Sequence, residues 1–151
     1  MVSTLSKEEI EVVLTGNALG RLGCNDGFNT YVFPVNYLYD GKYILCHSLT
    51  GFKIQVMRQN KRVCFLVDEV VDFTNWKSVM VVGEYQELND IRERYSAMKA
   101  FITRMLHLKI TDTALFTQLN NVKTTYQNSD SFRPIIYRIA IDEKTGKYET
   151  S

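Results

Sequence analysis

The residues best suited to chemistry lie around Lys53, in the first turn of a predicted short helix. A lysine there is unexpected, because the dipole at a helix N-terminus favours negative charge. The free N–H groups of such a turn, the hydroxyl groups of Ser48 and Thr50 and the small residue Gly51 together suit a bound phosphate. The alternative is a simple Ser/Thr helix cap beside an exposed lysine. His47 lies just upstream of this stretch.

The charge distribution supports an anion site at this place. No acidic residue occurs between Asp40 and Asp68, where about three would be expected by chance in a chain of this composition. A basic span without acids favours a bound anion. Arg58 and Lys61 also suit the C-terminal end of the helix dipole, so a structural role is the simpler interpretation for these two. The basic residues of the span are Lys42, His47, Lys53, Arg58, Lys61 and Arg62.

Composition and charge exclude several classes of protein. The 151 residues are 45% hydrophobic and 23% charged, which is typical of a soluble globular protein, and residues 1–151 are expected to form one domain. A net charge of +1 argues against a general nucleic-acid binder. No apolar run has the length of a membrane-spanning helix, and the first residues do not resemble a signal peptide. We therefore expect a cytoplasmic protein without nucleic-acid or membrane partners.

The three cysteines, Cys24, Cys46 and Cys64, lie in apolar, strand-like segments. Their number is odd, and no pair has the C-x-x-C spacing of a metal or redox site. We expect buried free thiols in a reducing compartment. His47 and His107 lack the spacing of zinc ligands, so no metal site is expected.

Three helices are predicted. The first opens with a capping box at Ser6 and ends near Gly16. The second covers about residues 50–60, and the third, which is the longest, begins at Asp90. Helical spacing predicts a buried face with Ile10, Val13 and Leu14 in the first helix and with Ile91, Tyr95, Met98, Ile102 and Met105 in the third.

Most of the remaining chain reads as short strands joined by tight turns such as Asp40-Gly41. This arrangement favours an α+β fold, an antiparallel six-stranded barrel with peripheral helices. Trp76 falls in a predicted loop, and residues 108–133 suggest only one short helix near 112–120. The predicted strands cover residues 18–24, 30–39, 42–47, 62–69, 78–88 and 134–142.

The strand over 30–39, TYVFPVNYLY, is apolar on both faces. A strand with one solvated face would alternate more cleanly. We therefore expect one face to meet the core and the other to meet a ligand, a helix or a partner subunit. Pro34 cannot donate to the hydrogen-bond ladder, so this strand is expected to have an edge or an irregularity there.

Several separate motifs resemble one protein family. They are P-V-N-Y-x-Y-D-G-x-Y-x-x-x-H-S-x-x-G-x-K from Pro34 to Lys53, then R-x-N-x-R-V-C-F, W-x-S-V-x-V-x-G from Trp76 to Gly83, and I-x-I-x-x-x-T-G-K from Ile139. In their order and spacing they resemble the pyridoxamine 5′-phosphate oxidase-like, FMN-binding split-barrel superfamily, with the nitroimidazole-resistance (Nim-type) branch as the nearest match.

The resemblance implies a split barrel that forms a homodimer, with FMN or alternatively FAD in a groove at the interface. Lys53 and the helix start would hold the phosphate, one strand would run along the flavin, and the partner subunit would contribute another. Trp76 and Lys77 would border the ring or pack in the interface. The implied cofactor-binding residues are Pro34, Val35, Asn36, His47, Ser48, Thr50, Gly51, Lys53, Trp76, Lys77, Ser78 and Val79.

The sequence departs from the family at two points. Phe52 stands where many relatives carry Arg or His, and no tryptophan follows Trp76, whereas the pyridoxamine phosphate oxidases proper carry a C-terminal Trp and Arg pair. We therefore do not expect vitamin B6 oxidase activity.

The resemblance and the residues together suggest a flavin-dependent reductase that moves electrons from a transiently bound nicotinamide to a small substrate such as a nitroimidazole. His47 is the candidate catalytic residue, as a proton donor, although phosphate or backbone hydrogen bonding is the simpler role. Two other hypotheses remain open: a flavin- or haem-binding sensor or carrier without turnover, and a structural dimer whose groove has lost its ligand.

Overall fold

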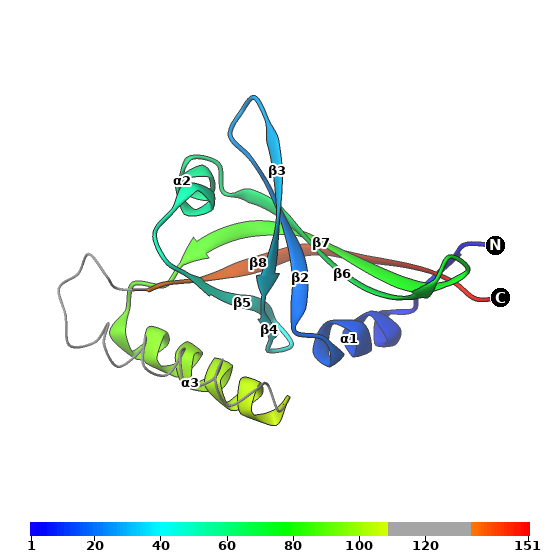
Figure 1. Cartoon of the computed structure of the whole chain (residues 1–151). Helices are drawn as coiled ribbons and strands as arrows, with labels where there is room; N and C mark the ends of the chain where they lie inside the picture. The colour runs from blue at the N-terminus through cyan, green and yellow to red at the C-terminus, as the bar shows by residue number, and fades with distance from the viewer. Residues whose placement is uncertain (109–133) are drawn as a thin grey trace.

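The computed structural model describes residues 1–108 and 134–151, and the short helix predicted near 112–120 lies outside this part. Within the described residues, three helices pack around one curled antiparallel sheet of eight strands (Figure 1). The strands are β1 (Ser3–Thr4), β2 (Leu19–Asn25), β3 (Thr30–Asn36), β4 (Leu38–Tyr39), β5 (Tyr43–Ser48), β6 (Arg62–Asp72), β7 (Asn75–Glu87) and β8 (Ile135–Glu149). The helices are α1 (Lys7–Gly16), α2 (Phe52–Gln59) and α3 (Ile91–His107).

The strand order in the sheet is β3-β2-β6-β7-β8-β5-β4, with β1 paired to β8. The predicted α+β class is confirmed, while the described sheet holds more than the six strands expected. Among the described strands, β3 lies at one edge of this order and pairs only with β2, so the edge predicted from Pro34 is present, with Arg21 opposite the proline. A proline is tolerated there because no further strand needs its missing N–H group.

The predicted strand over 30–39 is divided into two strands. β3 pairs with β2, whereas β4 pairs with β5 at the other end of the sheet order. The chain changes partners at Tyr37, whose N–H donates to the carbonyl of Ala18 at 2.9 Å. The hydroxyl of Tyr37 donates to the carbonyl of Leu14 at 2.7 Å in the core, which fixes this crossing point. Periodicity alone cannot show such a change of partner, because both pieces keep the same alternation.

The loop predicted to carry Trp76 is a tight hairpin. β6 continues to Asp72 and β7 begins at Asn75, so Trp76 lies in a strand opposite Val70. The Asp72 carboxylate accepts a hydrogen bond from the N–H of Thr74 at 2.9 Å, which closes the turn without glycine or proline. β8 likewise runs to Glu149 rather than ending at 142, because the long β7 strand offers it a partner along its whole length.

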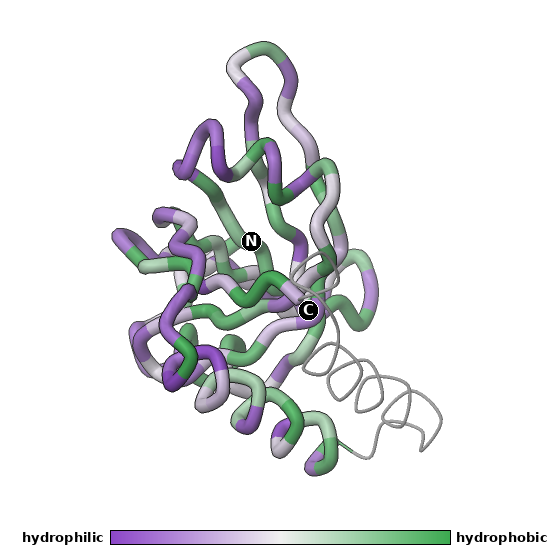
Figure 2. Tube along the Cα trace, turned by 90° about the vertical axis from the view of Figure 1, so that its left-hand side faces the viewer, coloured by the Kyte–Doolittle hydropathy of each residue, from purple (hydrophilic) through white to green (hydrophobic). Residues whose placement is uncertain are grey.

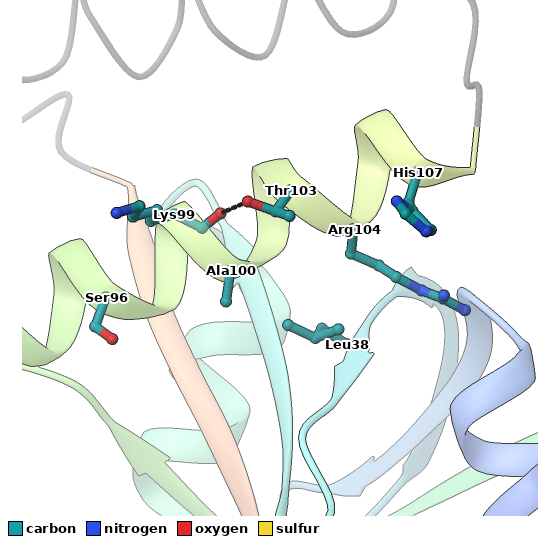
Figure 3. Close-up of a pocket in the computed structure, with 7 residues that line it drawn as sticks. All are labelled: Leu38, Ser96, Lys99, Ala100, Thr103, Arg104 and His107. Carbon is teal, nitrogen blue, oxygen red and sulfur yellow. Dashed lines mark hydrogen bonds between the residues drawn. The ribbon is translucent and has the colours of Figure 1, made fainter.

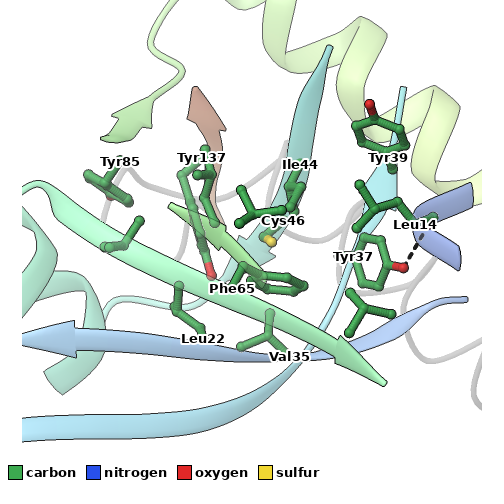
Figure 4. Close-up of a cluster of buried hydrophobic side chains, with 14 of the residues drawn as sticks. Leu14, Leu22, Val35, Tyr37, Tyr39, Ile44, Cys46, Phe65, Tyr85 and Tyr137 are labelled. Carbon is green, nitrogen blue, oxygen red and sulfur yellow. Dashed lines mark hydrogen bonds between the residues drawn. The ribbon is translucent and has the colours of Figure 1, made fainter. Parts of the chain in front are cut away.

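The core lies inside the curled sheet and is covered by the helices (Figure 4). α1 buries Ile10, Val13 and Leu14, as predicted. Cys24 and Cys46 are buried free thiols, as predicted, whereas Cys64 is only half-buried. Burial raises the pKa of Cys46 to about 12, so this thiol stays protonated. The largest fully buried side chains include Tyr37, Tyr85, Tyr137 and Phe65.

The prediction for α3 is partly wrong. Met98 and Met105 are buried as expected, whereas Ile91 and Tyr95 are exposed. Arg94 is buried in their place, and its guanidinium donates to the carbonyls of Leu88 at 3.3 Å and Pro134 at 2.7 Å. The prediction from apolar spacing placed the buried face of α3 one position away from its true place. It assumed that an arginine is exposed, whereas Arg94 is buried because its guanidinium bonds backbone carbonyls. No helix in the described part is long and apolar enough to cross a membrane.

Candidate functional site

The residues predicted to hold a phosphate lie at the N-terminus of α2. Gly51 is the N-cap residue, with extended backbone (φ −175°), and no side chain of the described residues caps the helix. The Ser48 hydroxyl instead donates to the carbonyl of Leu49 at 2.9 Å, and Thr50 is exposed. The simple Ser/Thr cap is therefore not what the chain forms. The N–H groups of the first turn are left without a side-chain acceptor, which is the state that a bound anion would complete.

The fold itself does not require glycine at position 51. Any residue adopts a φ near 180°, and a Cβ atom built on Gly51 would meet only the Leu49 carbonyl oxygen, at 3.9 Å. The glycine therefore leaves the backbone open to close approach from outside, which is the property that a phosphate cradle needs.

Lys53 is half-buried in the first turn of α2, and no carboxylate of the described residues lies within ion-pair distance of its amino group. Two other cations of the basic span are neutralised. Arg58 donates to both carboxylate oxygens of Glu87, at 2.8 and 3.1 Å, and Arg62 pairs with Asp142. The structural role expected for Arg58 is thus confirmed. Among the described residues, Lys53 is the cation of the span at the start of α2, whereas the other unpaired lysines, Lys42 and Lys61, are exposed away from it.

His47 lies beside Lys53, as the sequence suggested. Its ring packs edge-on against Phe101 of α3, with 4.7 Å between the ring centroids. Burial, and secondarily the nearby Lys53 charge, lower the pKa of His47 below the usual 6.5. The imidazole is therefore uncharged at neutral pH, which limits its use as a proton donor. Its packing links β5 and α3 at the base of the candidate site.

The predicted residues on β3 point to different faces of the sheet. Val35 is buried in the core, whereas Pro34 and Asn36 are exposed on the opposite face. Among these three, the side chains of Pro34 and Asn36 and the backbone of the edge strand can therefore meet a ligand or a partner. Val35 acts only through its main chain.

The second predicted group, Trp76 to Val79, does not join this site within one protomer. Ser78 pairs with Lys147 and His47 pairs with Ile136, so they are eleven residues apart along β8. That separation is about 35 Å along an extended strand. The β6–β7 hairpin and α2 accordingly lie at opposite ends of the sheet (Figure 1). Both groups can act on one ligand only if they come from different protomers.

Local bonding also limits what this second group can do. The Trp76 indole N–H donates to the Glu149 carboxylate at 3.3 Å, and the Val79 side chain is fully buried in its own core. Lys77 and Ser78 are half-exposed. Side-chain contacts to a ligand are therefore open to Trp76, Lys77 and Ser78, and not to Val79.

One feature near the site was missed by sequence reasoning. Phe52, noted only as the loss of a cation, meets Tyr31 of β3 edge-on, with 4.9 Å between ring centroids. Tyr31 in turn lies 6.4 Å from Phe33, with nearly parallel rings. The alternation of aromatic residues on β3 was visible in the sequence, but their contact with α2 is long-range and left no local signal.

Two grooves of the described part run along α3, and none of the predicted site residues lines either of them. The larger has a volume of about 610 Å³ and is lined by Leu38, Ser96, Lys99, Ala100, Thr103, Arg104 and His107 (Figure 3). The smaller, of about 420 Å³, lies between α3, β5 and β8. The described residues also contain no group of three or more His, Cys, Asp or Glu side chains able to hold a metal ion.

Comparison with known proteins places this geometry in a family. A crystal structure of an FAD-binding protein from Mesorhizobium loti is 30% identical, covers 99% of both chains and superposes with a TM-score of 0.76. A protein assigned to 5-nitroimidazole antibiotic resistance, from Bacteroides thetaiotaomicron, is 21% identical with a TM-score of 0.71, covering 98% of this chain and 87% of its own, and shows the same fold.

An uncharacterised protein from Rhizobium meliloti is 38% identical over 87 residues, a match that spans only 58% of either chain. The family model for pyridoxamine 5′-phosphate oxidase matches residues 6–148, which is nearly the whole chain. The chain therefore belongs to the pyridoxamine 5′-phosphate oxidase family.

Proposed function

We propose that this protein binds a flavin, as FMN or as the FMN half of FAD, with the phosphate at the start of α2. The observation that carries the proposal is the uncapped first turn of α2, combined with the unpaired Lys53 and the open backbone at Gly51. Each of these features suits a phosphate, and none is needed by the fold. The likeness to an FAD-binding protein over the full chain supports the same cofactor class.

The proposed active form is a homodimer. The sheet face opposite the core carries a largely apolar patch, the outer sheet face, made of two cross-strand rows, one of which passes through Gly23 of β2 and the other through Arg21. Val32 and Met80 are exposed there, at 65% and 43%. A second copy would cover this face and would bring its own Trp76–Ser78 segment toward the partner's α2. The outer sheet face comprises Val32, Pro34, Cys64, Leu66, Met80 and Val82.

The flavin, when bound, supplies the electron-transfer chemistry, and the protein supplies binding and orientation. Lys53 and the first-turn N–H groups would hold the phosphate. The unpaired edge of β3 would offer backbone N–H and C=O groups to the polar edge of the ring. The absence of a G-x-G-x-x-G motif is consistent with a nicotinamide donor that binds only transiently.

We place the reaction in the Nim-type branch, as flavin-mediated reduction of a small substrate such as a nitroimidazole. The support is the order of the motifs from Pro34 to Lys147. The packing of His47 favours a second candidate, a flavin- or haem-binding carrier without turnover. The His47 ring is neutral and packs against Phe101, so it is a poor proton donor. A reductase would need a general acid near the flavin, whereas His47 is better suited to binding.

An absorbance spectrum of the purified protein, followed by NADH or NADPH without oxygen, tests these proposals. We expect bands of oxidised flavin that bleach on addition of the nicotinamide, after which a nitroimidazole restores them. Flavin bands that persist with both nicotinamides would favour the carrier, and a Soret band would favour haem. A colourless protein that takes up neither FMN nor FAD would overturn the cofactor proposal itself.

A further inference from the structure

The turn of the β6–β7 hairpin exposes large apolar side chains to solvent. Val70, Val71 and Phe73 are 66%, 84% and 98% exposed. The turn that carries them is closed by the Asp72 carboxylate, which accepts a hydrogen bond from the N–H of Thr74 at 2.9 Å. We name Val70, Val71 and Phe73 the hairpin tip. Apolar side chains that gather at one exposed place commonly mark an interaction surface.

The hairpin tip is continuous with the outer sheet face. Side chains two positions apart in a strand share a face, so Val70 lies on the same side of β6 as Leu66. Val70 pairs with Trp76 of β7, as Leu66 pairs with Met80. The surface proposed to meet a second copy of the chain therefore continues along the hairpin as far as its turn.

A second exposed apolar pair lies at the start of α2. Leu49 and Phe52 are 68% and 53% exposed, on either side of the N-cap residue Gly51. We name Leu49 and Phe52 the helix-start patch. The β6–β7 hairpin and α2 lie at opposite ends of the sheet (Figure 1), so the hairpin tip does not reach this patch within one protomer. Contact between the two surfaces requires two chains.

The charges beside the two surfaces are opposite in sign. Residues 68–75 contain three acids and no base, whereas residues 41–67 contain no acid. In the described part of the chain, Lys53 at the start of α2 has no carboxylate within ion-pair distance. Two hairpin tips placed together would repel each other, while a hairpin tip and a helix-start patch attract. The charges thus favour a contact between unlike ends of two copies.

We infer that the hairpin tip of one protomer packs on the helix-start patch of a second copy of this chain, and so covers the proposed phosphate site of that copy. The contact with the flavin rests on the proposed function, whereas the contact between chains does not. Two-fold symmetry makes the contact twice in each dimer. Apolar side chains over the start of α2 exclude water, which strengthens the attraction between Lys53 and a phosphate.

Cross-linking of the full chain tests the contact directly. The half-buried Cys64 is first replaced by serine, since Cys24 and Cys46 are buried. Leu49→Cys and Phe73→Cys are then combined in one chain and treated with a short bis-maleimide. We expect a covalent dimer on a denaturing gel, and none from either variant alone. No covalent dimer from the combined variant, or an equal yield from Phe73→Cys alone, would overturn the inference.

The energetic test uses Phe73→Ser. Its ring is almost fully exposed in one protomer, so the change should leave the protomer folded. The dissociation constant of the dimer should rise by roughly 10-fold or more, the effect of one lost buried aromatic side chain, and bound flavin should dissociate faster. Phe28→Ser is the matched control, because Phe28 is 94% exposed in the β2–β3 arm, which projects at the top of Figures 1 and 2. It should change neither quantity.

The outcomes separate this inference from the flavin proposal. A chain that cross-links as expected but binds neither FMN nor FAD would overturn the proposed function and leave the contact between chains in place. A chain that binds flavin but does not cross-link would overturn the contact and leave the phosphate site. Sedimentation measures the dimer, and flavin fluorescence after dilution measures the release. Equal effects of Phe73→Ser and Phe28→Ser would also contradict a specific contact at the hairpin tip.

Discussion

At the scale of single residues, Lys53 carries the clearest prediction. Lys53→Glu places an anion where the phosphate is proposed to lie, so we expect the purified protein to lose its flavin. The fold should not suffer, because a glutamate suits the dipole at a helix start and Lys53 has no carboxylate partner in the described part. Absorbance at the flavin bands and a thermal melt of the flavin-free protein measure the two effects.

Lys61→Glu is the control for this change. Lys61 is exposed beyond the end of α2, in the same basic span, so it alters the net charge equally. It should keep the flavin. If Lys53→Glu still purifies yellow, or if both variants lose the flavin to the same extent, the phosphate does not lie at the start of α2.

His47 gives a prediction about pH. Its pKa is lowered in the folded protein by burial and by Lys53, so below pH 6.5 the unfolded chain binds more protons than the folded one. The free energy of unfolding should therefore fall as the pH drops below about 6.5, the ordinary pKa of histidine. His47→Gln should reduce that fall when flavin-free melts at pH 5.5 and 7.5 are compared. An equal fall in His47→Gln and in the unaltered protein would contradict the lowered pKa of His47.

The residue types of this candidate site can be read from the sequence because they lie close together along the chain. A lysine, two hydroxyl residues and a glycine at one helix start are visible in seven consecutive letters from His47 to Lys53. What the sequence could not show is which of these groups are already engaged. The Ser48 hydroxyl bonds to the Leu49 carbonyl, and the His47 ring packs against Phe101, which lies more than fifty residues away in the chain.

At the scale of elements, the close packing of β7 against β8 sets the next prediction. A Cβ atom on Gly83 would lie 2.2 Å from the Ala140 carbonyl oxygen, at the point where the register of the two strands shifts. Because that neighbour is backbone, it cannot rotate away. Gly83→Ala should lower the free energy of unfolding by about 1–3 kcal/mol, measured by denaturant titration.

Gly16→Ala is the matched control for Gly83. Gly16 ends α1, and no atom lies within 4 Å of an added Cβ. The same chemical change should then alter the free energy of unfolding by about 0.5 kcal/mol or less. Comparable losses at both positions would mean that the contact with β8 does not set the cost at Gly83.

The elements show where local signals suffice and where they fail. Asp40-Gly41 was read correctly as a turn because Gly41 takes a positive φ of 92°, a conformation with a clear sequence signature. The turn between β6 and β7 has no glycine and is closed by the Asp72 carboxylate, so it was taken for a longer loop. The extension of β8 to Glu149 depends on its pairing with β7. The sequence of a single strand does not show which distant strand it pairs with, so this extension could not be predicted.

At the scale of the whole molecule, the apolar character of both faces of the 30–39 segment is informative. One face of β3 enters the core through Val35, whereas the other carries Val32 and Pro34 into the outer sheet face. The sequence therefore predicted that this second apolar face is buried against another group, but not whether that group is a ligand, a helix or a partner subunit. Within one protomer, α2 and the Trp76–Ser78 segment lie far apart along β8. If both contact one ligand, as proposed, a second copy of the chain must therefore cover this surface.

The homodimer proposal yields the last prediction. Met80→Asp places a charge on the outer sheet face, and burying an unpaired carboxylate between subunits is costly, so the dimer should dissociate into folded monomers. Since each flavin is proposed to lie between two subunits, the monomers should also lose it. Light scattering after size-exclusion chromatography gives the mass, and absorbance gives the flavin content, with Val12→Asp on α1 as a control. A monomer that keeps its flavin would place the whole site within one chain, whereas a dimer that survives the change would move the interface to another face.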